Sequence, residues 1–444
     1  MSEKYEDFIT TYEELFHLKS NEPIIDTLNL IRNILISKYK RSIHQIIGCI
    51  FQAMQRNPHS IRNYVEILNL LSSLYPISFQ FIEEKTKNLK TFLSCNNNNG
   101  QCHFENKVIP VLHDEIYSII FNDQIDDFRN YIVTNNLPRY VLDRFYNDIF
   151  TLLEACAYYG SVNIFYFLLS NNSCEITGKF LSNAIIGGNT DIINECLKIH
   201  NPDRICFLNA IKSHNNKFLE YIFENELIDL DQHDLEMIEI NEIISSQNLK
   251  AVFLLYQAKW NVIPWCSAFP QTIEIFKTEN IDLNMLDDDC KNLLHYASCY
   301  NNIDLCEFLL SSSQAYHRPV NAFDIKNQTA LHYAALNDSA EVAKILISNG
   351  AYINRVNNEA QSPLDIARKM DFHNVIKILI ENDADKNTQK KPSKHIKLII
   401  PNVNYISYTD PFNYYKKNFA NKNKRKTGFH VAAESNDRIV KETS

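Results

Sequence analysis

Two neighbouring segments between Asp324 and Asn387 carry the same order of apolar and polar positions. Thr329–His332 is matched by Ser362–Asp365, and the apolar run Val342–Ile347 is matched by Val375–Ile380, at an offset of 33 residues in both cases. In each segment a short apolar stretch, a polar break and a second apolar stretch follow one another, with apolar residues at helical spacing. The pattern predicts two short helices per segment, joined by a tight turn.

Single residues mark where these predicted helices begin and end. Thr329 and Ser362 stand where a hydroxyl can accept a hydrogen bond from a backbone N–H at the helix start, and Pro363 follows at the first helical position. Gly350 follows the end of a second helix, where glycine adopts a left-handed conformation at little cost. Ala334 is small, so the two helices of a pair can approach closely. One pair cannot bury its apolar faces alone, which predicts that neighbouring pairs stack.

The period and the motif together resemble the ankyrin-repeat family, whose signature reads T-P-L-H-x-A-A and whose period is 33 residues. The resemblance implies an all-α fold, a helical N-terminal domain followed by an ankyrin-repeat α-solenoid with short β-hairpin loops. His295 and His332 occupy the histidine position of the signature, and Asp365 takes that position in the next unit. We therefore interpret both histidines as parts of the scaffold, where the imidazole holds the turn at the helix start.

The pattern of apolar positions changes several times along the chain. Residues 1–94 have apolar positions at helical spacing without the 33-residue period, which predicts a helical N-terminal domain. The remaining segments are an Asn-rich linker at 95–113 with a loop at Asn96–Asn99, degenerate ankyrin-like helix pairs at 114–290, regular repeats at 291–389 and a basic tail at 390–444. Within the tail, Thr427–Ala433 echoes the first helix of a repeat, either as a terminal partial unit or as the remnant of an interrupted one.

The degenerate segment keeps the order of helix, break and helix. Its predicted breaks fall at Asn122-Asp123, Gly160, Gly188 and His214. The steps from Gly160 to Gly188 and from Gly188 to His214 are 28 and 26 residues, shorter than the regular period. We therefore expect the hairpin loop between these pairs to be largely absent. Residues 235–276 lose the helix caps and are the weakest part of the pattern.

The stretch from Leu152 to Ile222 is more specific than a generic repeat. Its sequence, LLEACAYYGSVNIFYFL and later GGNTDIINECLKIHNPDRICFLNAIKSHNNKFLEYI, resembles a large family of protist ankyrin proteins, best known from trichomonads. In that family a helical N-terminal region and an uncharacterised ankyrin-like domain (DUF3447-like) precede regular repeats. The resemblance covers roughly residues 110–390, while the tail departs from the usual family ending. It implies an architecture and no particular biochemical role.

Composition adds a class and a compartment to this picture. Apolar residues make up 45% and charged residues 22%, which is ordinary for a soluble globular protein, and the net charge of −9 favours solubility. Only 8 glycines occur, so we expect Asn to take over left-handed turn positions. The 11 cysteines form no C-x-x-C pair, which indicates a reducing compartment. The N-terminus lacks an apolar signal core and no run is long enough to span a bilayer, so a cytoplasmic protein is expected.

Candidate chemistry is sparse. The sequence contains no phosphate-binding, dinucleotide-binding, zinc-protease, hydrolase or kinase motif. The run Asp287–Asp289 lacks the spacing of a calcium loop and is interpreted as a solvated turn. Cys95, Cys102 and His103 form at most half of a zinc site, because a second ligand pair at zinc spacing is missing. We therefore expect no enzyme activity, no cofactor and no metal.

The basic tail carries the main rival signal. Residues 390–426 hold many lysines and the single acid Asp410, with tyrosines interleaved. Such a segment is either a solvated tail or a surface for nucleic acid or an anionic membrane. The cluster Lys424–Lys426 (Lys424, Arg425 and Lys426) could also be read by nuclear import machinery.

The ankyrin resemblance implies a non-enzymatic scaffold that binds a protein partner on its concave face, made of hairpin tips and the exposed side of the first helices. The candidate contact residues are Tyr296, Tyr300, Lys326, Tyr333, Asn337, Asn358 and Lys369. Tyr296 and Tyr333 either form an exposed aromatic stripe or pack between repeats. One alternative is an adaptor whose residues 1–94 dock an effector such as a ubiquitin ligase. Another is a nuclear or nucleic-acid-associated protein that acts through residues 390–426.

Overall fold

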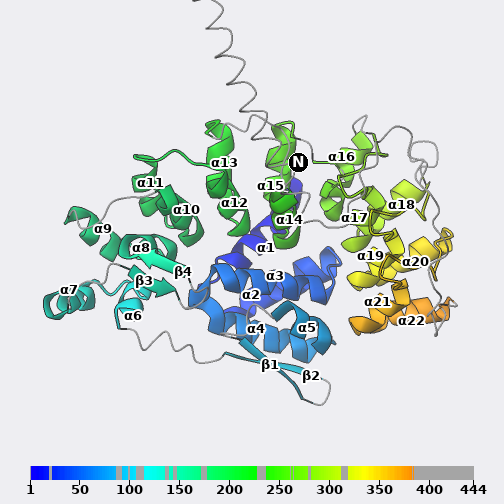
Figure 1. The fold of residues 1–444 in the computed structure, drawn as a ribbon, viewed down its shortest axis with the longest axis horizontal. Coiled ribbons are helices and arrows are strands. Elements are labelled where there is room, and N and C mark those ends of the chain that lie inside the picture. The colour runs from blue at the N-terminus through cyan, green and yellow to red at the C-terminus, as the bar shows by residue number, and fades with distance from the viewer. Residues whose placement is uncertain are drawn as a thin grey trace, which may run out of the picture. The chain divides into compact units, whose positions relative to one another are not determined.

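The computed structural model describes residues 2–19, 23–86, 93–98, 101–106, 115–135, 140–143, 148–171, 178–227, 237–260, 262–263, 265–278, 282–311, 319–382 and 384. All of them lie within one compact unit, Met1–Pro392. Helices dominate this unit, and the predicted all-α fold with stacked helix pairs is confirmed (Figure 1). The basic tail, with Lys424–Lys426 and the echo at Thr427–Ala433, lies outside the described residues.

Five helices and a β-hairpin make up the N-terminal part of the unit. They are α1 (Glu6–Phe16), α2 (Ile24–Leu30), which continues as a π-helix over Ile31–Lys38, α3 (Ile43–Arg56), α4 (Ile61–Leu74), α5 (Phe79–Lys85), β1 (Leu93–Asn98) and β2 (Gln101–Asn106). Ser42 begins α3 with a capping box, in which its hydroxyl accepts from the backbone N–H of Gln45 and the Gln45 side chain bonds back.

The hairpin corrects the prediction of a loop at Asn96–Asn99. Asn96–Asn98 is extended in β1, which pairs antiparallel with β2. Asn69 of α4 holds this hairpin, because its Oδ1 accepts from the backbone N–H of Phe104 at 2.8 Å and its Nδ2 donates to the Phe104 carbonyl at 2.9 Å. Asparagine is depleted in strands, so local propensity predicts a loop, and tertiary bonds override it here. The strand β2, within the predicted linker, is thereby attached to the N-terminal helices.

Helix pairs follow along the rest of the unit. They are α6 (Glu115–Phe121) with α7 (Ile125–Thr134), α8 (Leu152–Tyr159) with α9 (Val162–Ser170), α10 (Gly178–Gly187) with α11 (Thr190–Leu197), α12 (Arg204–Lys212) with α13 (Asn216–Glu224), α14 (Met237–Ser246) with α15 (Leu249–Gln257), α17 (Leu293–Cys299) with α18 (Ile303–Ser311), α19 (Ala330–Leu336) with α20 (Ala340–Ser348), and α21 (Pro363–Lys369) with α22 (His373–Glu381). First helices stack on first helices and second helices on second helices (Figure 1). This stacking buries the apolar faces that a single pair leaves open.

The helix cap predicted at Ser362 is present, whereas the Thr329 hydroxyl contacts Nδ1 of His332 at 2.9 Å. The hydroxyl of Ser362 accepts from the backbone N–H of Asp365 at 3.2 Å, and the Ser362 N–H donates to the Asp365 carboxylate at 2.9 Å. Thr151 and Glu154 form the same capping box at α8. Gly350, after α20, has a φ of 85°, as expected for a left-handed residue past a helix end.

The turn between the two helices of each pair contains a left-handed residue. These residues are Asp123, Gly160, Gly188, His214, Gln247, Asn301, Asp338 and Asp371, with φ between 49° and 71°. Most are not glycine, and two of the aspartates offset the backbone cost by a further bond: the Asp123 carboxylate accepts from the backbone N–H of Ile164 at 3.0 Å, and that of Asp338 accepts from the N–H of Val375 at 3.3 Å. Asn301 takes a glycine position as expected, Asp123 and His214 lie at predicted breaks, and Gln247, Asp338 and Asp371 serve at the other turns.

One unit departs from the helix pair, within the segment that the sequence marks as weakest. Two 3₁₀ turns, Trp265–Ala268 and Pro270–Thr272, lead into the short helix α16 (Ile273–Thr278). The hydroxyl of Ser267 donates to the Leu293 carbonyl at 3.1 Å, which fastens this unit to the next first helix. An additional antiparallel hairpin, β3 (Tyr140–Asp143) with β4 (Asp148–Thr151), lies between α7 and α8.

Between α8 and α10 the two backbones come very close together. A Cβ atom on Gly187 would lie 2.2 Å from the carbonyl oxygen of Ala157 and 2.8 Å from that of Tyr158. Gly187 is therefore required by close approach and not by its own backbone angles. This contact falls at the 28-residue step, where a short connection lets neighbouring pairs stack directly.

Candidate functional site

Three adjacent units present hairpin tips of the same construction. At each tip one side-chain oxygen accepts two backbone N–H groups, from the residues two and four positions later, at 2.7–3.0 Å. The accepting residues are Asp287, Asp324 and Asn357. Neighbouring tips are joined through their backbones, since the Lys326 carbonyl accepts from the N–H of Asn358 at 3.0 Å. The tips are therefore fixed in shape before any partner binds.

Two of these tips are each bonded by a tyrosine of the first helix that follows. The Tyr296 hydroxyl donates to Asp287 Oδ2 at 2.6 Å, and the Tyr333 hydroxyl donates to Asp324 Oδ2 at 2.7 Å, nine residues apart in both cases. Burial raises the pKa of both tyrosines, and the nearby carboxylate raises it further, so both remain proton donors. The third tip has Asn357, whose neutral amide has no second carboxylate oxygen that requires a donor. Nine residues later, the buried Ile366 stands in place of the tyrosine.

The two signature histidines tie each helix start to the next hairpin. Nδ1 of His295 accepts from the backbone N–H of Asn292 at 3.0 Å, so the proton is on Nε2, which donates to the Ala322 carbonyl at 3.2 Å. Nδ1 of His332 accepts from the Thr329 N–H at 3.1 Å in the same manner. Burial lowers the pKa of both histidines to about 4, so both are neutral at pH 7. This geometry supports a structural role.

The turns between paired helices lie against the N-terminal helices. We call this surface the helix-turn edge; it is at the opposite end of each first helix from the hairpin tip. Arg41, just before α3, donates from Nη1 to the Tyr300 carbonyl at the end of α17, at 3.1 Å. Ser78, at the start of α5, donates from its hydroxyl to the Met370 carbonyl at the end of α21, at 2.6 Å. The N-terminal helices thus bond the carbonyls that end two first helices.

His44 of α3 makes the contact between these two bonds. Its Nε2 accepts from the backbone N–H of Ser78 at 3.2 Å, so Nδ1 carries the proton and faces the Asp338 carboxylate at 3.5 Å. The imidazole also packs against the Phe372 ring, with 4.7 Å between ring centres. These four residues, His44, Ser78, Asp338 and Phe372, lie in the buried boundary between α3, α5 and the last two helix pairs.

The same edge is covered at the earlier pairs. His59 stacks on Phe121 at the end of α6 with 3.9 Å between ring centres, and Phe16 of α1 stacks on the left-handed His214 at 4.1 Å. Cys49 of α3 adds a hydrogen bond from its thiol to the Ser245 carbonyl of α14, at 3.5 Å. The N-terminal helices therefore contact the helix-turn edge from the first described pair to the last.

Arg41 is an unusual member of this boundary. It is 3% exposed, and its Nε and Nη2 have no hydrogen-bond partner within the described part of the chain. Its guanidinium lies 5.7 Å from the centre of the Phe8 ring, and burial lowers its pKa. A cavity of about 270 Å³, lined by Gly48 and Tyr300 among others, lies in the same boundary. The contact between the N-terminal helices and the helix-turn edge is extensive but leaves two of the Arg41 nitrogens without hydrogen-bond partners among the described residues.

The predicted aromatic stripe is not exposed as expected. Tyr296 is 8% exposed and Tyr333 is half-buried, and their hydroxyls are used by the hairpin tips. The alternative of packing between repeats describes their rings better, since Tyr333 meets His295 of the preceding unit edge to face at 5.5 Å. Contact of either tyrosine with a partner stays a prediction.

The other five predicted contact residues separate onto two surfaces. Tyr300 and Asn337 are half-buried and line the cavity beside the N-terminal helices. Lys326 and Asn358 are exposed at hairpin tips, and Lys369 is exposed at the end of α21. The predicted contact residues therefore do not share one exposed surface, because the helix-turn edge is covered within the chain itself.

Sequence reasoning missed the residues that build this cover, Arg41, His44 and Ser78. No local signal marks them, because their partners lie hundreds of positions away. The Asp–Tyr pairs at a spacing of nine residues were visible in the sequence and could have indicated the hairpin ties.

The candidate metal ligands make other contacts, such as the Cys102 thiol with the Ile77 carbonyl and His103 with Glu105. Both oxygens of Asp287 are engaged in the turn, and Asp289 pairs with Lys291 at 2.8 Å. Cys95 and Cys102 lie on the two strands of the β1–β2 hairpin. Within the ranges described above, no group of three or more His, Cys, Asp or Glu side chains could hold a metal ion. Nor is any helix in these ranges long and apolar enough to cross a membrane.

Two family models match the chain. Residues 171–256 match a domain of unknown function (DUF3447). Residues 244–357 and 314–390 match the model for ankyrin repeats (3 copies). The uncharacterised domain therefore covers the degenerate pairs from α10 to α15, and the repeat model begins within it, so that the two matches overlap over residues 244–256.

Several curated proteins are similar over short stretches. The transient receptor potential cation channel subfamily A member 1 homolog of Caenorhabditis elegans is 31% identical over 145 residues, 32% of this chain and 12% of that protein. The E3 ubiquitin-protein ligase Ufd4 of Drosophila melanogaster is 27% identical over 114 residues, 25% of this chain and 4% of that protein. The human transient receptor potential cation channel subfamily A member 1 is 40% identical over 65 residues, 15% of this chain and 6% of that protein. The chain thus spans a small fraction of each relative, and its own architecture is a domain of unknown function (DUF3447) followed by ankyrin repeats in a helical solenoid.

Proposed function

We propose that this protein is a non-enzymatic scaffold whose partner-binding surface is the row of hairpin tips. Ankyrin repeats indicate protein interaction in general. The observation that supports the tips in particular is the cover on the helix-turn edge, which the N-terminal helices contact from α6 to α21. A partner therefore meets the repeats from the other end of the first helices, where equivalent positions are exposed.

The tip surface has the composition of a small docking site. The second residue of the three tips is Asp288, Ile325 or Asn358, all exposed, and Ile325 is an apolar side chain with 56% of its surface exposed. Lys326 is exposed beside it. Because the tips are already fixed by side-chain turns and tyrosine ties, binding costs little ordering entropy. An apolar anchor between polar neighbours is the usual anatomy of an interface centre.

The test compares two lysine variants in the full chain. Proximity labelling in the native cell identifies partners of the unchanged protein, and purified partner is then titrated against Lys326→Glu and against Lys377→Glu. Lys377 is an exposed lysine of α22 on the outer row of helices, so it controls for the same change of charge. We expect at least tenfold weaker binding for Lys326→Glu and no change for Lys377→Glu. Equal affinity of both variants would remove the tips as the binding surface.

Each alternative function has its own test. An adaptor with residues 1–94 docking an effector such as a ubiquitin ligase needs a second face on the N-terminal helices, and the exposed Ile25 and Leu74 mark one. Changing both to Ser should then release the effector and leave the tip partner bound. Nucleic-acid binding through residues 390–426 predicts an affinity that falls steeply with salt. Membership of the trichomonad-type protist family is part of the proposal, and it rests on the sequence between Leu152 and Ile222.

A further inference from the structure

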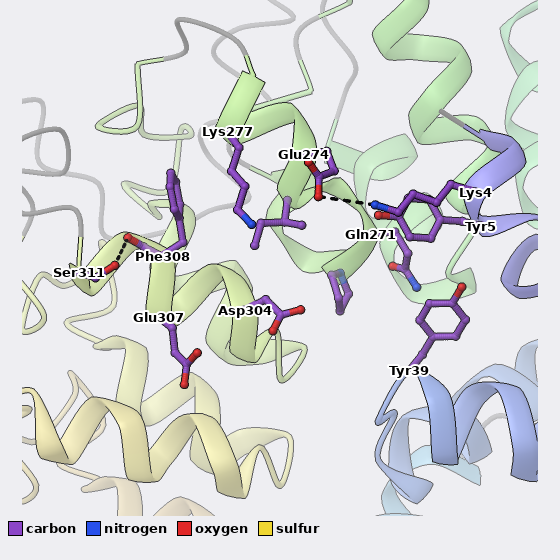
Figure 2. A pocket seen from close by; sticks show the side chains of 12 residues that line it. Lys4, Tyr5, Tyr39, Gln271, Glu274, Lys277, Asp304, Glu307, Phe308 and Ser311 are labelled. Carbon is purple, nitrogen blue, oxygen red and sulfur yellow. Dashed lines mark hydrogen bonds and ion pairs between the residues drawn. The ribbon is translucent and has the colours of Figure 1, made fainter.

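A cavity of about 770 Å³ opens where the irregular unit interrupts the helix pairs. The 3₁₀ turn Pro270–Thr272 and α16 form its floor, the start of the chain and Tyr39 form one wall, and α18 forms the other (Figure 2). Because this unit lacks a full first helix, the neighbouring elements do not close over it. The volume falls in the range of sites that hold a ligand or a short peptide segment.

The floor contains an unpaired buried amide. Gln271 is 2% exposed, and within the described residues neither its Nε2 nor its Oε1 has a hydrogen-bond partner. Figure 2 shows this side chain directed into the space between Tyr39 and Asp304. A buried amide without partners costs free energy, and such groups are rare in folded proteins. Its terminal torsion is soft, so the amide can turn its donor and acceptor to meet a ligand.

The walls combine aromatic rings with carboxylates. Tyr5 and Tyr39 stand on one side, and Phe308 stands on the other beside Glu307 (Figure 2). Asp304 is exposed on the first turn of α18. These surfaces favour a ligand with both apolar and charged parts.

The charges at the cavity favour a basic ligand. Glu274 is paired with Lys4 at 3.6 Å, whereas Asp304 and Glu307 have no ion pair with any described residue. Lys277 is the one further cation among the lining residues. Two carboxylates against one ammonium leave the site with a net negative charge.

We propose that this cavity binds an extended peptide segment of a partner protein, with an arginine or lysine side chain beside Asp304 and Glu307. A peptide bond offers one donor and one acceptor, which is the complement of the Gln271 amide. An adjacent apolar or aromatic residue of the peptide packs on Tyr5 and Tyr39. This site is separate from the hairpin tips, and its test does not depend on them.

The experiment selects ligands from a displayed library of random heptapeptides on the full-length chain and measures the recovered peptides by fluorescence anisotropy. We expect the recovered sequences to share a Lys or Arg at one position. Gln271→Leu should weaken their binding at least tenfold without harming the fold, because it removes two unpaired polar atoms from a buried site. The pair Asp304→Asn with Glu307→Gln should weaken it at least tenfold as well.

The matched control is Glu341→Gln with Glu381→Gln, which removes two exposed carboxylates from the outer helices and should leave the affinity unchanged. Lys326→Glu should also leave it unchanged, which separates this site from the hairpin tips. Recovery of no peptides, a consensus without a basic residue, or affinity that is indifferent to Gln271→Leu would overturn the proposal. Binding of AMP or UMP in place of peptides would overturn it too, in favour of a nucleobase site.

Discussion

Replacing Tyr333 by Phe removes one hydroxyl and leaves the ring in place. That hydroxyl donates to Oδ2 of Asp324 at 2.7 Å, and Asp324 is buried, while its other oxygen remains bonded to two backbone N–H groups. Hydrogen bonds to a charged group contribute about 1.5–3 kcal/mol to stability. Tyr333 is half-buried, so water partly replaces the lost donor, and we expect a loss of about 2 kcal/mol in the free energy of unfolding.

A double-mutant cycle with Asp324→Asn isolates this bond from general damage. The amide keeps an oxygen for the two backbone N–H groups, as Asn357 does in the next unit. Against an amide the tyrosine bond is neutral, so Tyr333→Phe should then cost roughly 0.5–1 kcal/mol. The coupling energy between the two positions is therefore expected to be about 1 kcal/mol, in the range seen for residues in direct contact.

Urea unfolding followed by far-ultraviolet circular dichroism gives the required free energies. Tryptophan fluorescence is less suitable, because Trp260 and Trp265 lie outside the ankyrin repeat that contains Tyr333. A change below about 0.5 kcal/mol for Tyr333→Phe, or a coupling energy of zero, would refute the structural tie. Unchanged stability together with at least tenfold weaker partner binding would instead restore Tyr333 to the partner surface.

Four further substitutions or conditions test other parts of the molecule. Gly187→Ala should destabilise the protein by more than about 3 kcal/mol, because its new Cβ would lie 2.2 Å from a backbone oxygen. Gly48→Ala, with nothing within 4 Å of the added Cβ, should stabilise α3 by up to about 1 kcal/mol, and urea unfolding measures both glycine variants. The folded-state pKa of His295 and His332, about 4, lies below the ordinary value of 6.5, so the unfolded chain binds more protons between these values. The contribution of each histidine to the free energy of unfolding should therefore be complete above pH 6.5 and decrease towards pH 4, by on the order of 3 kcal/mol per histidine. An unfolding free energy from urea titrations that does not change with pH in this range would contradict the assigned bonds. Arg41→Met should change the unfolding free energy by less than about 1 kcal/mol or raise it, because two guanidinium nitrogens are buried without partners, and a loss above about 3 kcal/mol would indicate that they have partners after all.

Bonds that close over three or four residues were predictable from the sequence. The capping box of Ser362 with Asp365 and the left-handed Gly350 depend on residue types at fixed short spacings, which the 33-residue period makes visible. The same holds for the breaks at Gly160 and His214. Periodicity and caps therefore predicted the helix pairs and much of their spacing, even where glycine is scarce.

Long-range contacts were outside the reach of such patterns. Arg41 and Tyr300 are separated by 259 positions, and neither has a sequence feature that points to the other. Tyr300 and Asn337 were predicted as exposed for this reason, since exposure was inferred for each repeat as if nothing covered its helix-turn edge. The hairpin at Asn96–Asn98 was missed similarly, because its strands are held by Asn69 of a preceding helix.

The two ends of each first helix are thus built by different kinds of interaction, and this difference bears on function. A hairpin tip is held by the side chain of its first residue, such as Asp324 with Tyr333, and by backbone bonds to the neighbouring tip, so side chains such as Ile325 and Lys326 can change without loss of shape. The helix-turn edge is held by the N-terminal helices, so a change at Asp338, whose carboxylate faces His44, disturbs a distant element. Freedom to vary side chains on a fixed frame is what a partner-binding surface requires. That freedom exists at Ile325 and Lys326 and is lacking at the turns.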